Sequence, residues 1–285
     1  MQHSSGRSNL SMSRFLLPLT LLAGFAASVP AQTTKSDTAK GPPKIEDNSF
    51  LVEEAYNQEY GVVQHISAFQ RTRQGSWAYA FTQEWPAPSQ RHQLSYTVPV
   101  LRPDPSGSPG VGDIALNYRF QAVGKDEEPL WFSPRVSLFL PTGDVKRGRG
   151  AGGAGLEVML PFSYAISDAL VTHWDVGGNL ARFNDGVGVR GTSRGLKVAA
   201  SAIWLLAPTI NLMLESVATR SEVPLGAGRY ATVTSYVVSP GVRGAINFAS
   251  GLQVVPGIAM PIGVGSTSSG QRDVFLYLSF EHPFR

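Results

Sequence analysis

The chain has 285 residues and no cysteine, which excludes a disulfide framework, a thiolate nucleophile and a cysteine-ligated zinc site. Its formal charge is +3, and loss of the two arginines within residues 1–31 would lower this to +1 (3 minus 2), so no basic surface for nucleic acid is indicated. Charged residues make up 16% of the chain, below the roughly 25% of soluble domains, which indicates that part of the surface contacts something other than water.

Residues 1–31 have the pattern of a cleaved signal peptide. Arg7 and Arg14 precede an apolar run at residues 15–27, which is followed by a small-residue cleavage site ending at Ala31. A transmembrane anchor is the alternative, but the apolar run is shorter than the roughly 20 residues that a bilayer-spanning helix requires. We therefore expect export of the chain and removal of this leader.

Residues 32–60 are expected to form a flexible periplasmic N-terminal segment. Residues 32–44 are polar and contain proline and glycine, which is typical of an unstructured leader. In residues 45–61, acidic side chains surround a short apolar group, so a short helix capped by Asn48 or Ser49 could form there. Two interpretations of this part stay open: a segment that docks in the periplasm, which we expect, and a plug or gate for a pore.

After Gly61 the chain is a succession of segments in which apolar and polar residues alternate. A period of two is the pattern of a strand with one apolar face. Twelve such segments are separated by glycine, proline, asparagine and aspartate, at residues 62–71, 76–85, 91–101, 111–123, 130–140, 154–166, 169–181, 194–206, 209–220, 231–247, 251–262 and 272–284. An even number of strands puts both chain ends at the same end of a closed barrel. We predict an all-β fold, a closed up-and-down antiparallel transmembrane β-barrel of about 12 strands, over residues 61–285.

The two faces of these strands distinguish a membrane barrel from a soluble sandwich. One face of the second segment carries Trp77, Tyr79 and Phe81, and the interleaved face carries Thr82 and Glu84. A sandwich would turn the apolar face inward, whereas a membrane barrel turns it toward lipid and encloses a polar interior. Aromatic residues gather near the segment ends, and long glycine-rich connectors alternate with shorter ones. Both features favour a barrel in the bacterial outer membrane with both termini in the periplasm.

The last segment alternates apolar and polar residues from Val274 to Phe280. Because an open strand edge is not tolerated in hydrocarbon, we expect this strand to pair with the first one and close the barrel. Phe284 also looks like the C-terminal aromatic signal that such barrels present to the barrel-assembly machinery, although Arg285 follows it.

Residues 198–214 are mostly apolar and offer an alternative interpretation as a transmembrane helix. Pro208 and Asn211 interrupt the run, and both residues favour a turn. We therefore predict two strands joined by a tight turn in this stretch.

Three stretches share a characteristic order of motifs: VGDIALNYRF at residues 111–120, PRVSLFLPTGD at residues 134–144 and GLEVMLPFSYAISDAL at residues 155–170. A Gly-Asp opens a strand, a later strand ends in Pro-Thr-Gly-Asp, and a glycine-rich loop follows. With these motifs, residues 45–285 resemble the outer-membrane β-barrel family labelled phenol-degradation meta-pathway proteins. The resemblance implies an outer-membrane channel-like protein, in some members tied to uptake of aromatic compounds, and it carries over no catalytic residue.

The charged residues expected to face the barrel interior are candidates for lining a pore. They are Glu84, Arg91, Asp113, Arg119, Arg135, Glu157, Asp175, Lys197, Glu215 and Arg243. Ions enclosed in a barrel must be paired or wet, so these side chains either line a watery channel or knit a closed lumen. Their mixed signs predict weak charge selectivity, and the inward aromatic residues Phe139, Phe275 and Tyr277 favour small, relatively apolar solutes. A structural or anchoring barrel without an open pore is the alternative.

No cofactor or metal is expected. Asp113 and Asp144 lie beside glycines at strand ends, where a carboxylate commonly forms a turn by accepting backbone hydrogen bonds. A metal site is the alternative, but neither residue has other ligands at a suitable spacing.

No enzymatic activity is expected either. An outer-membrane lipid hydrolase would need a serine nucleophile, a histidine base and an orienting polar group at the lipid-facing rim. His173, with Asp175 two residues later, is the candidate base for that alternative, but no nucleophile motif accompanies it. The expected partners are outer-membrane lipid, the barrel-assembly machinery and small-molecule solutes, and nucleic acid is not among them.

Overall fold

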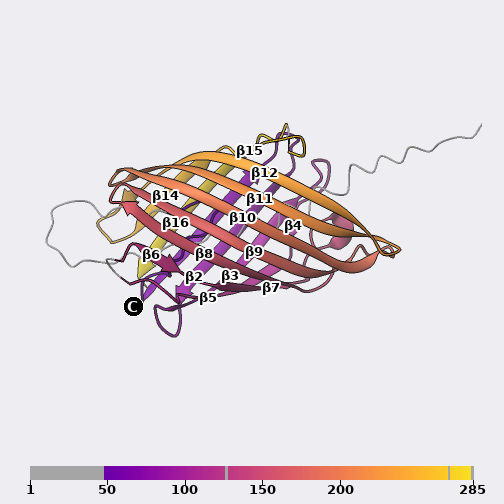
Figure 1. Ribbon diagram of the computed structural model, residues 1–285, viewed down its shortest axis with the longest axis horizontal. Coiled ribbons are helices and arrows are strands. Elements are labelled where there is room, and N and C mark those ends of the chain that lie inside the picture. The colour runs from indigo at the N-terminus through magenta and orange to yellow at the C-terminus, as the bar shows by residue number, and fades with distance from the viewer. Residues whose placement is uncertain (1–47, 126–127, 269, 284–285) are drawn as a thin grey trace, which may run out of the picture.

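The computed structural model describes residues 48–125, 128–268 and 270–283, which form one antiparallel β-barrel with strands tilted across its axis (Figure 1). Within these residues, twelve strands of at least six residues make up the wall: β1 (Val62–Arg71), β2 (Trp77–Pro86), β3 (His92–Arg102), β5 (Ile114–Phe120), β7 (Arg135–Leu140), β8 (Gly155–Ser167), β9 (Leu170–Asn184), β10 (Arg190–Ala207), β11 (Ile210–Gly226), β12 (Arg229–Gly244), β14 (Gln253–Ala259) and β16 (Val274–Pro283). Short pieces extend the ladders: β4 (Gly110–Val111), β6 (Leu130–Phe132), β13 (Ile246–Asn247) and β15 (Ile262–Gly263). One turn of 3-10 helix, η2 (Val145–Arg147), lies in a connector.

The barrel closes between its first and last strands. β16 pairs with β1 along its whole length, from Val62 opposite Pro283 to Arg71 opposite Val274. β14 pairs with both β12 and β16, so every described wall strand has two neighbours. A closed wall is the condition for placing a sheet in hydrocarbon. The predicted all-β closed barrel is therefore confirmed, as is the pairing of its terminal strands; Phe284 and the leader at residues 1–31 lie outside the described residues.

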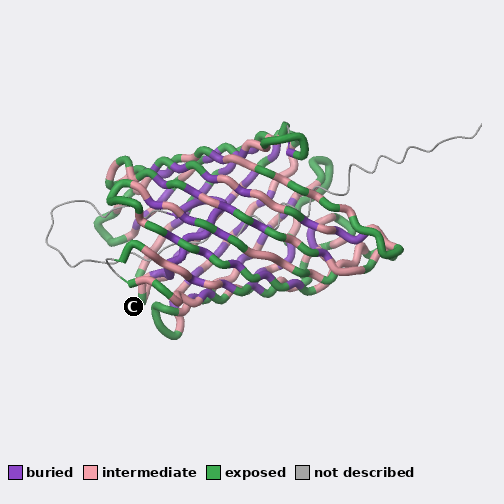
Figure 2. The backbone as a smooth tube through the Cα atoms, viewed as in Figure 1, coloured by how far each residue is buried: buried purple, intermediate pink, exposed green. Residues whose placement is uncertain are grey.

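Buried and exposed residues alternate along the strands of the wall (Figure 2), and many of the exposed ones are large apolar residues. In β8, Leu156, Val158 and Leu160 are exposed, whereas Glu157 and Met159 between them are buried. A soluble sandwich would show the opposite arrangement. An apolar exterior around a polar interior is the arrangement of a membrane barrel, whose outer face contacts lipid.

Residues 198–214 belong to two strands, as predicted. They include the end of β10 and the start of β11, which are joined at residues 208–209. No helix within the described ranges is long and apolar enough to cross a bilayer.

The connectors differ between the two ends of the barrel. At the end that holds Val62 and Pro283, β8 joins β9 through residues 168–169 and β10 joins β11 through residues 208–209, although residues 121–134, which include β6, form a longer connector. At the other end, residues 141–154 join β7 to β8 and residues 260–273, which include β15, join β14 to β16, although the hairpins of β9–β12 end in turns of five and two residues. We refer to these as the short-connector end and the long-connector end.

Residues 183–193 are predicted as a glycine-rich loop, but most of them extend β9 and β10. The turn is only residues 185–189, where the Asp185 carboxylate accepts the backbone N–H groups of Val187, Gly188 and Val189, all at 2.9 Å. These hydrogen bonds lower the pKa of the Asp185 carboxyl because they stabilise its charged form. The bond from Val187 has the largest effect.

Residues 221–230 are also predicted as a loop and also continue a hairpin. β11 and β12 are joined by Ala227 and Gly228, whose φ angles are 49° and 70°. Positive φ at both central residues is the geometry of a two-residue turn that matches the twist of the flanking strands. The hairpins of β9–β12 consequently project at the right of Figure 1.

Two predicted strands are interrupted. Residues 111–123 contain β5, separated from β4 by Gly112 and Asp113. Residues 130–140 contain β6 and β7, separated by Ser133 and Pro134. Proline has no N–H to continue a ladder, which accounts for the second break.

Asp113 ties the connector after β7 to the wall. Its two carboxylate oxygens accept the N–H groups of Gly143 at 2.9 Å and Ala151 at 2.8 Å. Asp144 accepts the N–H of Lys146 at 3.0 Å and caps η2. Asp144 therefore forms a turn, as predicted, whereas the Asp113 carboxylate holds a distant connector and does not form a turn of its own.

Candidate functional site: the barrel lumen

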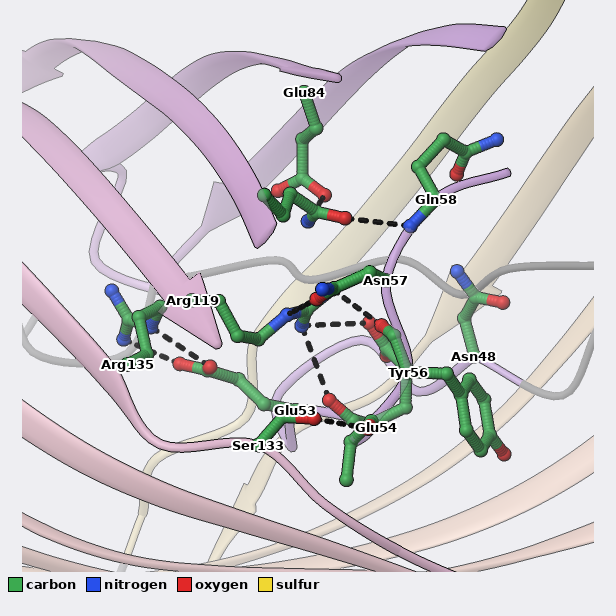
Figure 3. Close-up of polar contacts among 12 residues, drawn as sticks. Asn48, Glu53, Glu54, Tyr56, Asn57, Gln58, Glu84, Arg119, Ser133 and Arg135 are labelled. Atoms are coloured by element: carbon green, nitrogen blue, oxygen red, sulfur yellow. Dashed lines mark hydrogen bonds and ion pairs between the residues drawn. The ribbon is translucent and has the colours of Figure 1, made fainter. Parts of the chain in front are cut away.

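Residues 48–58, here named the lumen segment, lie inside the barrel (Figure 3). Every residue of the lumen segment is buried, and none is in a helix or strand. This placement corrects the expectation of a flexible periplasmic segment for that part of residues 32–60. It also corrects the expected helix beginning at Asn48 or Ser49. Of the two interpretations of this part, a periplasmic docking segment and a plug or gate, its position inside the barrel is that of a plug. Residues 32–47 are outside the described ranges.

The lumen segment crosses the barrel from one side to the other. Ser49 Oγ donates to Ser201 Oγ of β10 at 2.6 Å, and the N–H of Gln58 donates to Gln93 Oε1 of β3 at 2.6 Å. Four strands lie between β3 and β10 on the shorter way around the wall. Because Gln93 is near the start of β3 and Ser201 is in the later part of β10, the segment fills the half of the barrel nearer the short-connector end.

Phe50, Leu51 and Val52 fill an apolar part of the lumen. Their neighbours on the wall are Ile66, Ala68, Ala199, Ile203, Met213, Val217, Val255, Ala259, Phe275 and Tyr277. The Phe50 ring lies 5.4 Å from the ring of Phe275 and 5.1 Å from that of Tyr277, between centroids, in tilted contacts typical of favourable aromatic pairs. The inward placement predicted for Phe275 and Tyr277 is thus observed, and both rings hold the segment.

Two glycines make room for the Phe50 ring. A Cβ at Gly257 of β14 would lie 2.4 Å from Phe50 Cζ, and a Cβ at Gly241 of β12 would lie 3.1 Å from Phe50 Cε2. The contact at Gly257 is well inside van der Waals distance, so the position of Phe50 requires glycine there. At Gly241 the added Cβ would be tight against Ala259 Cβ and Met213 Cγ, both at 3.0 Å, as well as against Phe50.

We expect Gly257→Ala to destabilise the barrel by about 1–3 kcal/mol, because the added methyl group overlaps the Phe50 ring. The measurement is urea unfolding in lipid vesicles. Phe50→Ala in the same chain should remove the cost of the methyl group, and Gly244→Ala is a matched control because its Cβ would lie 3.5 Å from the nearest atom. Equal costs with and without the Phe50 ring would contradict this account of the glycine.

Side chains of the wall satisfy the main chain of the lumen segment. Glu215 Oε1 accepts the N–H groups of Phe50 at 2.9 Å, Leu51 at 2.6 Å and Val52 at 3.2 Å. Lys197 Nζ donates to the Leu51 carbonyl at 2.9 Å. A buried irregular segment has no ladder of its own, so its backbone groups must find such partners. This explains how a segment without secondary structure is held in one conformation.

Arg119 of β5 binds the later part of the segment, from Glu54 to Asn57 (Figure 3). Its Nε donates to Asn57 Oδ1 at 3.0 Å, its Nη1 to the Glu54 carbonyl at 3.1 Å and its Nη2 to the Tyr56 carbonyl at 2.6 Å. Its Nη1 also lies 3.5 Å from Glu54 Oε1. Three of these four acceptors are uncharged, so this contact depends on geometry as well as on charge.

Arg135 of β7 binds the segment through a carboxylate. Its Nε donates to Glu53 Oε2 at 2.8 Å and its Nη2 donates to Glu53 Oε1, a bidentate arrangement. The same Nη2 lies 2.8 Å from Glu157 Oε1 of β8. Arg135 is therefore enclosed by one carboxylate of the segment and one of the wall.

Eight of the ten residues predicted to line a pore lie on the inner wall. They are Glu84, Arg119, Arg135, Glu157, Asp175, Lys197, Glu215 and Arg243, all buried. Their role in conduction stays a prediction. Asp113 is buried too, but its carboxylate binds the connector after β7.

The inward placement of Arg91 is wrong. β3 begins at His92, so residue 91 belongs to a connector and does not follow the alternation of the strand. The Arg91 guanidinium lies 5.2 Å from the centroid of the Phe120 ring and donates to the carbonyl groups of Gln121 and Ala122, both at 3.2 Å. It is exposed at the short-connector end.

The sequence patterns miss the residues of the lumen segment itself. Glu53 and Glu54 are among the most buried side chains described, although a pair of adjacent glutamates normally indicates an exposed position. The signal available was their place next to an apolar triplet, in a chain whose wall carries inward arginines.

The Ser163–His173 pair lies under the lumen segment and not at a lipid-facing rim. Ser163 Oγ and His173 Nδ1 are 2.8 Å apart, and the N–H of Ala55 donates to Ser163 Oγ at 2.8 Å. Both side chains are fully buried. A lipid substrate would have no access to this pair in the described conformation.

No family model and no curated protein matches the chain. Among solved structures, an outer membrane channel from Pseudomonas putida F1 is similar with a TM-score of 0.59 at 12% identity, over 80% of this chain and 97% of that one. The NanC porin (TM-score 0.48, 6% identity, 76% and 98% covered) and the CymD monoaromatic hydrocarbon channel (TM-score 0.41, 10% identity, 80% and 90% covered) are similar to a lesser degree. The first likeness shows a barrel fold of the outer-membrane type.

Proposed function

We propose that this chain is a channel of the bacterial outer membrane and that its lumen segment closes the channel. The main observation is that the barrel wall closes on itself through β1 and β16, whereas the lumen segment pairs with no strand among the described residues and is held by hydrogen bonds that involve a side chain, such as those of Glu215 and Arg135. A wall complete without the segment leaves a lumen when the segment moves. The fold likeness to the outer membrane channel of Pseudomonas putida F1 supports the proposal.

We propose that the channel passes small, relatively apolar solutes and selects only weakly between cations and anions. The apolar cluster around Phe50 supports the first part, because displacement of Phe50 would expose the rings of Phe275 and Tyr277. The mixed signs of the buried charges on the wall support the second part.

Swelling of proteoliposomes tests this function with sugars, amino acids and phenols of matched size. The full chain is compared with Phe50→Ala/Glu53→Gln, which weakens two of the contacts that hold the lumen segment: the packing of Phe50 and the pairing of Glu53 with Arg135. We expect faster permeation through the variant, with phenols ahead of charged amino acids after correction for leak through lipid. The reverse order would contradict the solute preference. No permeation of any solute through either protein would favour the alternative, a structural or anchoring barrel without an open pore.

We further propose that the short-connector end faces the periplasm, which places the start of β1 and the end of β16 there. Long loops outside and short turns inside are usual for barrels of this class. A protease site inserted at Val187, which is 83% exposed in the β9–β10 turn, should be cut by protease added to intact cells. A site inserted at Tyr60 should be cut only after the outer membrane is permeabilised. Cutting at Tyr60 alone in intact cells would reverse the assignment.

A further inference from the structure

We infer that Arg119 and Arg135 form a binding site for small carboxylate-bearing solutes, and that Glu53 and Glu54 occupy this site while the lumen segment is in place. The inference rests on the channel proposed above and adds the chemical class of its solute. The carboxylates of the segment stand in for the carboxylate of that solute.

The pairing of β5 with β7 places two arginines side by side, and their positive charges require anions nearby. Arg119 and Arg135 are directly opposite each other on β5 and β7, and both are buried. Like charges opposite each other across a ladder destabilise a sheet. Of the described carboxylates in ion pairs with these two arginines, Glu157 belongs to the wall, whereas Glu53 and Glu54 belong to the segment. Departure of the segment therefore removes two of the three carboxylates in these ion pairs and leaves Glu157 and, farther from the arginines, Glu84 of the wall. An anion from solution would restore the lost contacts.

The two carboxylates of the segment fit this site unequally. Glu53 meets Arg135 through both of its oxygens, the arrangement that a planar carboxylate and a guanidinium favour. Glu54 approaches Arg119 only to 3.5 Å, and neither of its buried oxygens accepts a hydrogen bond from a described residue. A buried carboxylate without hydrogen bonds is costly. The Glu54 side is thus where a better-placed carboxylate can first enter, and displacement of the segment is complete only when Glu53 also leaves Arg135.

The surroundings define the rest of the solute. When the lumen segment leaves the arginines, Phe50, Leu51 and Val52 leave the apolar cluster with it. The vacated space then has two cationic groups on β5 and β7 and an apolar wall on the other side. A small carboxylate with an apolar body matches both. Its apolar body agrees with the solutes proposed above, whereas its charge is selected at this one site within a lumen of mixed charge.

A single cysteine reports displacement of the segment in the full chain. The chain has no cysteine, so Val52→Cys gives one thiol, and Val52 is 1% exposed. We expect benzoate to accelerate reaction of this thiol with a membrane-impermeant maleimide by about tenfold, whereas benzamide, of the same shape but neutral, leaves the rate unchanged. Inorganic phosphate as a further probe tests whether any anion suffices.

Variants of the same full chain identify the site. With Arg135→Gln, the thiol should react faster without ligand, since the Glu53 contact is lost, and benzoate should cause no further change. With Glu53→Gln, half of the maximal effect should need less benzoate, because the competing carboxylate is gone. Arg91→Gln is the matched control, since this exposed arginine lies outside the lumen, and it should respond as the parent does. Arg135→Lys, which keeps the charge, should show a reduced response even if Arg135→Gln fails to fold.

Equal acceleration by benzamide, an equal response to phosphate, or an undiminished benzoate response in both Arg135 variants would overturn the inference. Lack of any acceleration by benzoate in the parent and in Glu53→Gln would overturn it as well. The labelling needs no ion current, so it is independent of the test of the channel. Permeation without dependence on carboxylate would refute this site alone, whereas displacement by benzoate without permeation in any variant would refute the channel.

Discussion

Deletion of residues 48–58 is expected to convert a closed barrel into a steadily conducting one. In planar bilayers the conductance should rise by about tenfold or more, because water and ions replace a segment that now crosses the lumen from β10 to β3. The wall itself should persist, since β1 begins at Val62 and pairs with both β2 and β16 without the segment.

Two comparisons make this result specific. Phe50→Ala/Glu53→Gln should raise the frequency of openings without reaching the conductance of the deletion, because the segment stays tethered. Tyr60→Ala, at an exposed residue just outside the lumen segment, should behave as the parent does. If the deleted barrel, shown to be folded by its heat-dependent gel migration, conducts no more than the parent, the lumen segment does not close a channel.

Replacement of Arg135 by leucine is expected to cost about 3–5 kcal/mol in the free energy of unfolding. Arg135 forms ion pairs with Glu53 and Glu157, all three groups being nearly or completely buried. Leucine leaves two carboxylates facing each other in a poorly hydrated site, so desolvation and repulsion act together. Urea unfolding in lipid vesicles measures the loss.

The control for Arg135→Leu is Arg91→Leu, which removes an exposed arginine and should stay within about 0.5 kcal/mol of the parent. Arg135→Leu/Glu53→Leu should recover part of the loss, because one of the stranded carboxylates is gone. A cost for Arg135→Leu as small as that for Arg91→Leu would show that the Glu53–Arg135–Glu157 group is not a structural element of the lumen.

The strands of the wall were predictable from local pattern. A strand exposes one face to lipid and the other to the interior, so the alternation in β8 between Leu156, Glu157 and Val158 identifies both faces without knowledge of any neighbour. Errors arose where that pattern stops. The hairpin tips of β9–β12 extend beyond the alternating region, and Arg91 follows the alternation in sequence but lies in a connector.

The lumen segment was not predictable in the same way. Its acidic and apolar residues have no period, and adjacent glutamates normally indicate an exposed position. Their burial depends on Arg119, Arg135 and Lys197, which stand far along the chain and meet only after the barrel has closed.

By itself, then, the sequence determined an exported-type leader pattern, an all-β wall of about twelve strands and an interior of mixed charge, because each of these follows from residue type and a period of two. Only the tertiary structure decided that residues 48–58 fill the lumen and that Arg119 and Arg135 face each other across β5 and β7. The physical reason is that the partners of a buried charge are chosen by closure of the barrel, which brings together side chains whose separation along the chain carries no local signal.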